Sequence, residues 1–119
     1  MIKKFLIATH NPAKFKELKQ SCQFLINKGI EILSLENLKI KNKPAETGNT
    51  FKQNALLKAK YYADLSKCVT LSDDGGLCIQ ILKGEPGVKS RNWLGYEATD
   101  EELISHALKV LKGKTNKQR

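Results

Sequence analysis

The feature that most constrains the fold is a change of hydrophobic period near the amino terminus. Residues Lys3 to Ala8 form a short apolar run that ends at a turn, which is typical of a strand buried in an α/β sheet. After Asn11-Pro12 the apolar residues recur at spacings of three and four, at Phe15, Leu18, Cys22 and Leu25. Asn11 suits a helix cap, Pro12 suits the first helical position, and Gly29 is placed to end the helix. The chain therefore opens with a strand that leads into an amphipathic helix.

The same two periods predict the remaining elements. Strands are expected over residues 30–35, 68–71 and 77–82, and a helix is expected to begin near Asn49 or Thr50. The polar stretch 36–47 and the glycine-containing stretch 83–95 predict loops, the second of which carries Trp93. Thr99 and Glu102 form a capping-box pattern that predicts a last helix over residues 100–111. We therefore expect an α/β fold with a mixed sheet and flanking helices.

Size and composition limit the class of protein. A chain of 119 residues is long enough for one domain with a real core and too short to favour two. It contains no apolar run of the ~20 residues needed to span a bilayer, and its first apolar run is too short for a signal peptide, so we expect a cytoplasmic protein that is not inserted in a membrane. Cys22, Cys68 and Cys78 lack metal-binding spacing, which favours free thiols.

Charge points to an anionic partner. The chain has 21 basic and 12 acidic residues, a formal net charge of +9. Such an excess favours a polyanion, and a nucleotide, a nucleic acid and an acidic membrane surface all remain open. Part of the excess lies in residues 112–119, which we interpret as a solvated basic tail.

The first polar cluster lies where the first strand meets the first helix. Thr9 and Asn11 can donate hydrogen bonds there, and Lys14 adds a full charge beside the helix amino terminus. Backbone N–H groups at such a terminus suit a phosphate. The alternative is an ordinary Asn-Pro cap with a surface lysine, and His10 between these residues is interpreted as a loop residue.

Two further clusters carry carboxylates. Glu46 precedes the second helix and could bind a metal, with Lys58 two turns into that helix, although an acidic residue near a helix start is common. Asp73 and Asp74 end an apolar strand and repel each other, so the pair favours a cation. Gly75-Gly76 would let the backbone adopt φ > 0 and approach a ligand, and an Asp-Gly hairpin turn is the structural alternative.

In order and spacing these clusters resemble the inosine/xanthosine triphosphate pyrophosphatase family, from residue 1 to about residue 111. The family pattern T-x-N-x-x-K is matched at residues 9–14, E-T-G-x-T-F at 46–51 and N-A-x-x-K-A at 54–59. D-D-x-G-L follows at 73–77, P-G-V at 86–88 and G-x-x-A-T-D at 95–100. Several patterns in one order make a chance match improbable.

The resemblance implies a role for each cluster. It places the triphosphate on Thr9, Asn11, Lys14, Lys58 and the backbone near Gly75. Glu46 and Asp74 would hold Mg²⁺, and Asp74 would also be the general base that activates water. Asp73 would be a neighbouring or nucleotide-contacting residue. The implied fold is that of the family, an α/β structure that is usually dimeric.

The chain departs from the family pattern in two places. Arg91 comes one position earlier than in the family's Tyr-Ser-x-Arg pattern, so contacts from this loop, including those of Trp93, are not carried over. The later Gly-Tyr-Asp-Pro and Ser-His-Arg patterns, which help grip the purine, do not occur in this sequence. We therefore expect a truncated form of the fold, with a partial domain over residues 1–111.

The expected function is metal-dependent hydrolysis of non-standard purine nucleoside triphosphates, such as ITP, dITP and XTP, to the monophosphate and pyrophosphate. The expected enzyme is a homodimer with a purine nucleoside triphosphate as its partner. The alternative is a truncated, non-catalytic module that binds nucleotide or nucleic acid through its basic surface, although nucleic acid is the less favoured partner.

Overall fold

The computed structural model of the chain describes residues 2–115. The chain divides into two compact units, Met1–Asp74 and Gly75–Arg119. The polar clusters before Gly75 all belong to the first unit, so its architecture decides where their side chains lie.

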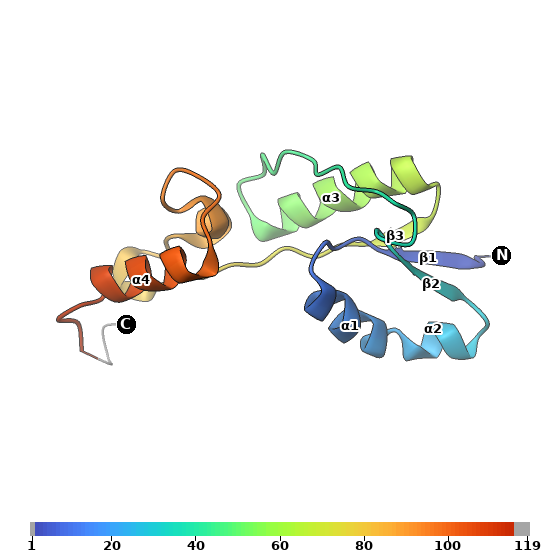
Figure 1. The fold of residues 1–119 in the computed structure, drawn as a ribbon, viewed down its shortest axis with the longest axis horizontal. Helices are drawn as coiled ribbons and strands as arrows, with labels where there is room; N and C mark the ends of the chain where they lie inside the picture. The colour runs from blue at the N-terminus through green and yellow to red at the C-terminus, as the bar shows by residue number, and fades with distance from the viewer. Residues whose placement is uncertain (1, 116–119) are drawn as a thin grey trace. The chain divides into compact units, whose positions relative to one another are not determined.

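The first unit is built on a small parallel sheet. Its strands are β1 (Lys4–Ile7), β2 (Glu31–Ser34) and β3 (Val69–Leu71), in the order β2-β1-β3 (Figure 1). Both strand pairs are parallel, and the N–H of Ala8 donates to the carbonyl of Leu71 at 2.9 Å, just beyond the paired ends of β1 and β3. The α/β class is confirmed, but within residues 2–115 the sheet is parallel rather than mixed.

Helices cover both faces of this sheet. The helices α1 (Pro12–Ser21) and α2 (Gln23–Asn27) lie on one side, and α3 (Phe51–Ser66) lies on the other (Figure 1). Because successive strand residues point to opposite faces, a central strand between two helical layers must be apolar on both sides. This explains why Phe5 to Ala8 is a continuous apolar run rather than an alternating one.

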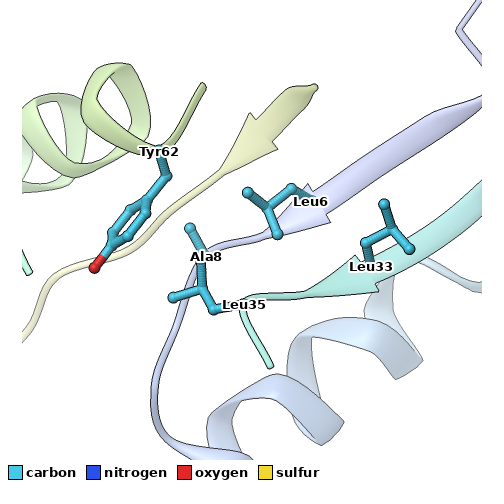
Figure 2. Packing of buried hydrophobic residues seen from close by; sticks show 5 residues of the cluster. All are labelled: Leu6, Ala8, Leu33, Leu35 and Tyr62. Atoms are coloured by element: carbon cyan, nitrogen blue, oxygen red, sulfur yellow. The ribbon is translucent and has the colours of Figure 1, made fainter. Parts of the chain in front are cut away.

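The core lies between β1, β2 and α3. Leu6 and Ala8 of the first strand segment are buried on the face that α3 covers, together with Leu33 and Leu35, and Tyr62 of α3 closes the cluster (Figure 2). Ile7, which points to the opposite face, is also fully buried. Burial of apolar surface on both faces is the main driving force for this unit.

The predicted first helix is divided in two. Cys22 has ψ of 16° and is buried, and its carbonyl accepts from the N–H of Leu25 at 2.9 Å, an i+3 bond that tightens the chain locally. The chain then continues as α2, which ends at Asn27. Gly29 follows the C-cap Lys28 and has φ of +82°, which agrees with its predicted role in ending the helix. The apolar periodicity could not reveal the break because it passes through Cys22 unchanged.

Two anchors hold the long segment between β2 and α3. The hydroxyl of Tyr62 donates to the carbonyl of Asn42 at 2.8 Å. The N–H of Gly48 donates to the side-chain oxygen of Asn54 at 2.7 Å, and Asn54 is 1% exposed. Glu46 lies between the two anchored positions, so a segment without regular structure is nevertheless fixed against α3.

The second unit contains the short 3₁₀ helices η1 (Gln80–Leu82) and η2 (Gly87–Asn92) and the helix α4 (Asp100–Val110). The strand predicted over residues 77–82 is wrong. Within the described residues this segment makes one isolated bridge, Cys78 with Pro86, and then turns at Lys83 and Gly84, both with positive φ. Only Ile79 of the apolar run is buried, so the run lacks the continuous partner that a strand needs.

The carboxylates of Asp73 and Asp74 therefore follow a strand but do not lie in a strand-to-strand turn. The predicted loop over residues 83–95 contains η2. Trp93 directly follows η2 and is half-buried. Of the predicted basic tail over 112–119, residues 116–119 lie outside the described residues. Within the described part of the chain, every helix falls short of the length and apolar content that a membrane crossing requires.

The capping box of α4 is confirmed. The N–H of Glu102 donates to the hydroxyl of Thr99 at 3.2 Å, and the N–H of Thr99 donates to the carboxylate of Glu102 at 3.1 Å. Three acidic residues in the first turn add favourable charge near the positive end of the helix dipole.

We predict that Thr99→Ala destabilises α4 by ~1 kcal/mol, because it leaves a backbone N–H of the first turn without its side-chain acceptor. Amide hydrogen exchange along α4 measures the effect. Thr99→Ser keeps the hydroxyl and should exchange as the unchanged chain does. Equal protection in Thr99→Ala would show that this cap contributes nothing.

We predict that Gly48→Ala destabilises the first unit by about 1–3 kcal/mol, because an added Cβ would lie 2.6 Å from the side-chain oxygen of buried Asn54. Gly75→Ala is the matched control, since an added Cβ there meets nothing within 4 Å. Denaturant unfolding of both variants tests the prediction. Equal midpoints would show that the segment moves aside without cost.

Candidate functional site

The polar clusters meet at one end of the sheet. In a sheet of order β2-β1-β3, the strand order reverses between β1 and β3, and ligands bind at the carboxyl ends of such neighbouring strands. Thr9 to Lys14 follow β1, and Asp73 and Asp74 follow β3. Parallel pairing therefore brings the first and third clusters to the same edge.

Asn11 caps α1 as the sequence predicts. Its side-chain oxygen accepts from the N–H groups of Ala13 at 3.0 Å and Lys14 at 3.2 Å, and its own N–H donates to the hydroxyl of Thr9 at 3.2 Å. The side-chain oxygens of Thr9 and Asn11 thus accept hydrogen bonds from nearby backbone N–H groups. The amide N–H groups of Asn11 and the hydroxyl hydrogen of Thr9 are the donors left for an anion.

Lys14 bridges the first and third clusters. Its Nζ lies 3.2 Å from a carboxylate oxygen of Asp73, and both side chains are partly exposed. The hydrogen bond that Lys14 donates to Asp73 and the negative charge of that carboxylate raise the pKa of Lys14, with a smaller contribution from Glu17. Lys14 therefore stays charged at neutral pH and lies beside the aspartate pair.

Lys58 joins the second and third clusters. Its Nζ lies 3.1 Å from a carboxylate oxygen of Glu46 and 3.5 Å from one of Asp74. The Asp74 side chain is 11% exposed and that of Lys58 is 19% exposed, so this pair is the least hydrated part of the cluster. Two carboxylates from distant segments thus approach one ammonium group. The sequence predicted that Glu46 and Asp74 share a metal ion, and it did not predict that both pair with Lys58.

The charges of this cluster do not balance. Asp73, Asp74 and Glu46 supply three carboxylates, against the two ammonium groups of Lys14 and Lys58. The cluster is therefore net negative by one charge, which opposes a polyphosphate unless further positive charge enters with it. Within residues 2–115, no group of three or more His, Cys, Asp or Glu side chains is placed to hold a metal ion.

These residues fit a divalent cation that arrives with its substrate. Mg²⁺ prefers hard oxygen ligands and is commonly held by one or two carboxylates together with substrate phosphates. Glu46 and Asp74 already approach a common positive charge at Lys58. The donor set therefore suits Mg²⁺ without requiring a third protein carboxylate.

The glycines after the aspartates act differently from the prediction. Neither Gly75 nor Gly76 has positive φ, so the prediction that they supply a left-handed turn is wrong. Gly75 directly follows Asp74, is exposed and has open space around it. Gly76 is confined by Ser90, because an added Cβ would collide with its hydroxyl, and Ser90 also accepts from the N–H of Leu77 at 2.8 Å.

His10 has partners that the sequence did not reveal. Its Nε2 lies 3.1 Å from the hydroxyl of Tyr62 and 3.3 Å from the carbonyl of Asn42. Burial raises the pKa of Tyr62, with smaller contributions from Tyr61 and Glu46. The only signal for this contact was the position of His10 between Thr9 and Asn11, since its partners are more than thirty residues away in sequence.

Arg91 and Trp93 have partners within the second unit. The Arg91 guanidinium donates to a carboxylate oxygen of Asp100 at 2.8 Å and to the carbonyl of Ala98 at 3.1 Å. The Trp93 ring meets the His106 ring edge to face, with centroids 4.6 Å apart. Both side chains thus contribute contacts around the start and face of α4.

Known proteins resemble this chain over almost all of its length. A dITP/XTP pyrophosphatase from Leptospira interrogans is 41% identical over 118 residues, which is 99% of this chain and 58% of that protein. The enzyme of the same name from Bacillus subtilis is 38% identical over 100% of this chain and 59% of its own length. The chain therefore spans less than two thirds of the length of these relatives.

Solved structures agree in fold. A HAM1 protein from Coxiella burnetii superposes with a TM-score of 0.77 at 31% identity, over 98% of this chain and 57% of that one. A nucleoside-triphosphatase, or dITP/XTP pyrophosphatase, from Mycobacterium abscessus gives a TM-score of 0.73 at 31% identity, over 98% and 59% of the two chains. The model of the Ham1 family matches residues 5–119. With its sheet order, its converging clusters and this match, the chain belongs to the Ham1 family.

Proposed function

We propose that this chain carries the triphosphate- and metal-binding part of an enzyme that hydrolyses non-standard purine nucleoside triphosphates, such as ITP, dITP and XTP, to the monophosphate and pyrophosphate. The observation that carries the proposal is the approach of Glu46 and Asp74 to the same Lys58 ammonium group, at 3.1 and 3.5 Å. The names of the relatives, dITP/XTP pyrophosphatases, support the substrate class.

The phosphates bind to the first cluster and to Lys58. Lys14 and Lys58 supply full positive charges from two helices, and the donors of Thr9 and Asn11 lie beside the amino terminus of α1. Lys14 exchanges its contact with Asp73 for a phosphate oxygen. The backbone at Gly75 is exposed and open, and it can approach a phosphate without a side chain in the way.

Asp74 is the proposed general base. Its carboxylate is largely buried beside Lys58, which orients a carboxylate oxygen to accept a proton from water. Asp74 positions this water against the α-phosphorus, and Lys14 and Lys58 stabilise charge on the departing pyrophosphate. Mg²⁺ bound by Glu46 and Asp74 would supply Lewis-acid polarisation of the phosphate oxygens. Asp73, released by Lys14, is a neighbouring or nucleotide-contacting residue.

The proposal extends to the context of the enzyme. We propose that residues 1–111 form the family domain and that 112–119 form a basic extension. We further propose a homodimer that works in the cytoplasm with Mg²⁺ as its cofactor. In this proposal the three clusters bind the phosphates and the metal, so they do not by themselves select the purine base.

We predict that Asp74→Asn lowers kcat for pyrophosphate release by roughly 10²- to 10⁴-fold, because an amide cannot accept the proton of the attacking water. Asp73→Asn, one residue away, should lower kcat much less. The measurement is pyrophosphate release from inosine, xanthosine and guanosine triphosphates, with Mg²⁺ and with a chelator. Release that survives the chelator, or equal losses in the two variants, would contradict the proposed roles.

A second candidate function rests on the net charge of +9, which favours a non-catalytic module that binds nucleotide or nucleic acid. Nucleic-acid binding should weaken steeply as salt rises and should tolerate a chelator. Hydrolysis should instead require Mg²⁺. This candidate would be favoured if an oligonucleotide binds with a steep salt dependence and without need of Mg²⁺, and if the chain releases no pyrophosphate from inosine, xanthosine or guanosine triphosphate.

A further inference from the structure

We propose that His10 and Tyr62 form a positioning pair that holds the phosphate-binding turn after β1 in register with the segment that carries Glu46. This inference rests on the function proposed above and adds two residues to its site. Within the described part of the chain, neither residue forms a hydrogen bond or ion pair with the clustered carboxylates. Both connect the segments that present them.

The pair joins three segments that are far apart in sequence. His10 belongs to the turn that presents Thr9 and Asn11, Tyr62 belongs to α3, and Asn42 belongs to the segment before Glu46. The three groups meet within 3.3 Å of one another. Their contact is therefore the point where the turn, the helix and the segment are tied together.

Tyr62 gives this contact a rigid base. It is 2% exposed and closes the core over Leu6 and Leu35 (Figure 2). Its ring also meets that of Tyr61 edge to face, with centroids 5.1 Å apart. It is also four residues after Lys58, so the two side chains lie on the same side of α3. The groups that Tyr62 contacts, His10 and Asn42, are thus held at a set position relative to the Lys58 ammonium group.

The hydrogen-bond arrangement assigns a proton to His10. The hydroxyl hydrogen of Tyr62 is committed to the carbonyl of Asn42, at 2.8 Å, and that carbonyl can only accept. A bare Nε2 on His10 would then face two oxygen lone pairs at 3.1 and 3.3 Å, which is repulsive. The geometry therefore requires a hydrogen on Nε2 of His10, shared between the two oxygens.

The hydrogen on Nε2 of His10 determines which variants test the inference. The side-chain amide of Gln reaches the position of a histidine Nε2 and can donate there, whereas Ala removes the donor. His10→Gln should therefore restore what His10→Ala loses. Tyr62→Phe removes the hydroxyl that joins Asn42 while keeping the ring in the core, and Tyr61→Phe is its matched control for loss of a phenol hydroxyl.

The kinetic test uses pyrophosphate release by the full chain with Mg²⁺. His10→Ala and Tyr62→Phe should each lower kcat by about 10- to 100-fold, because misplacement of reacting groups by about 1 Å has an effect of this size. KM should change by less than about threefold. His10→Gln should recover most of the lost kcat, and the double variant should be no worse than His10→Ala alone.

Three kinetic results would overturn the inference. A rise in KM without a fall in kcat would make His10 a substrate-binding residue. A loss of kcat that merely follows the loss of folded protein, measured by circular dichroism, would make the contact structural. Full activity in His10→Ala and Tyr62→Phe would show that the contact positions nothing.

A second readout does not depend on activity. Nitrogen-15 NMR of the imidazole groups, with the His106→Gln variant to assign the two histidines, should show hydrogen on Nε2 of His10. Amides over residues 42–48 should exchange faster in His10→Ala and in Tyr62→Phe than in the unchanged chain, His10→Gln and Tyr61→Phe. Hydrogen on Nδ1 alone, or unchanged exchange in both variants, would overturn the inference.

The two proposals fail separately. If the unchanged chain releases no pyrophosphate from any of the three nucleotides, the proposed function fails, and the NMR and exchange measurements still decide whether His10 and Tyr62 hold the segment. If the unchanged chain is active and His10→Ala behaves identically in all measurements, the proposed function stands and the positioning pair does not.

Discussion

Parallel pairing of β1 with β3 is the constraint on which the candidate site depends. The two strands share a direction, so the segments that leave their carboxyl ends emerge side by side. That geometry brings Lys14 within 3.2 Å of Asp73 although 58 residues separate them along the chain. An antiparallel pairing would have placed the two clusters at opposite ends of the sheet. The pairing itself depends on burial of Leu6 and Ile7, which are fully covered between two helical layers.

The helix α3 supplies the third part of the site and also its scaffold. One helix presents Lys58 to two carboxylates, places Asn54 against Gly48, and places Tyr62 against Asn42. The first contact belongs to the candidate site, and the other two hold the segment that carries Glu46 against the helix. Because all three arise from one rigid element, the position of the loop carboxylate relative to the lysine is set by helix geometry rather than by the loop.

A cluster with one surplus negative charge is unsuited to a polyphosphate alone and suited to one that brings a divalent cation. Lys14 pairs with Asp73 and Lys58 pairs with Asp74, and these opposite charges offset the repulsion between the two adjacent carboxylates. In the proposed function, the lysines change partner from carboxylate to phosphate, and no new charge is created. This reading unites the basic composition of the chain with its acidic cluster.

The sequence by itself determined the local elements and the chemistry of each cluster. The apolar run before Thr9, the Asn-Pro cap, the end of the helix at Gly29 and the capping box of α4 depend on near neighbours, and all are present in the structure. The predicted strand over residues 77–82 failed because an apolar run becomes a strand only when another strand pairs with it along its length. The break at Cys22 was hidden for a similar reason, since period alone does not record local backbone angles.

The tertiary structure decided which side chains meet. We expected Glu46 and Asp74 at a shared metal ion and Lys58 at a phosphate. The pairing of both carboxylates with Lys58 and the contact of His10 with Tyr62 were not foreseen. The roles that the resemblance assigned to these residues stay predictions. Spacing in sequence fixes distances only over a few residues, whereas these contacts span tens of residues and arise from how the sheet orders its strands and how α3 packs on it. Residue types could therefore be read from the chain, but their convergence was decided by the packing of the core.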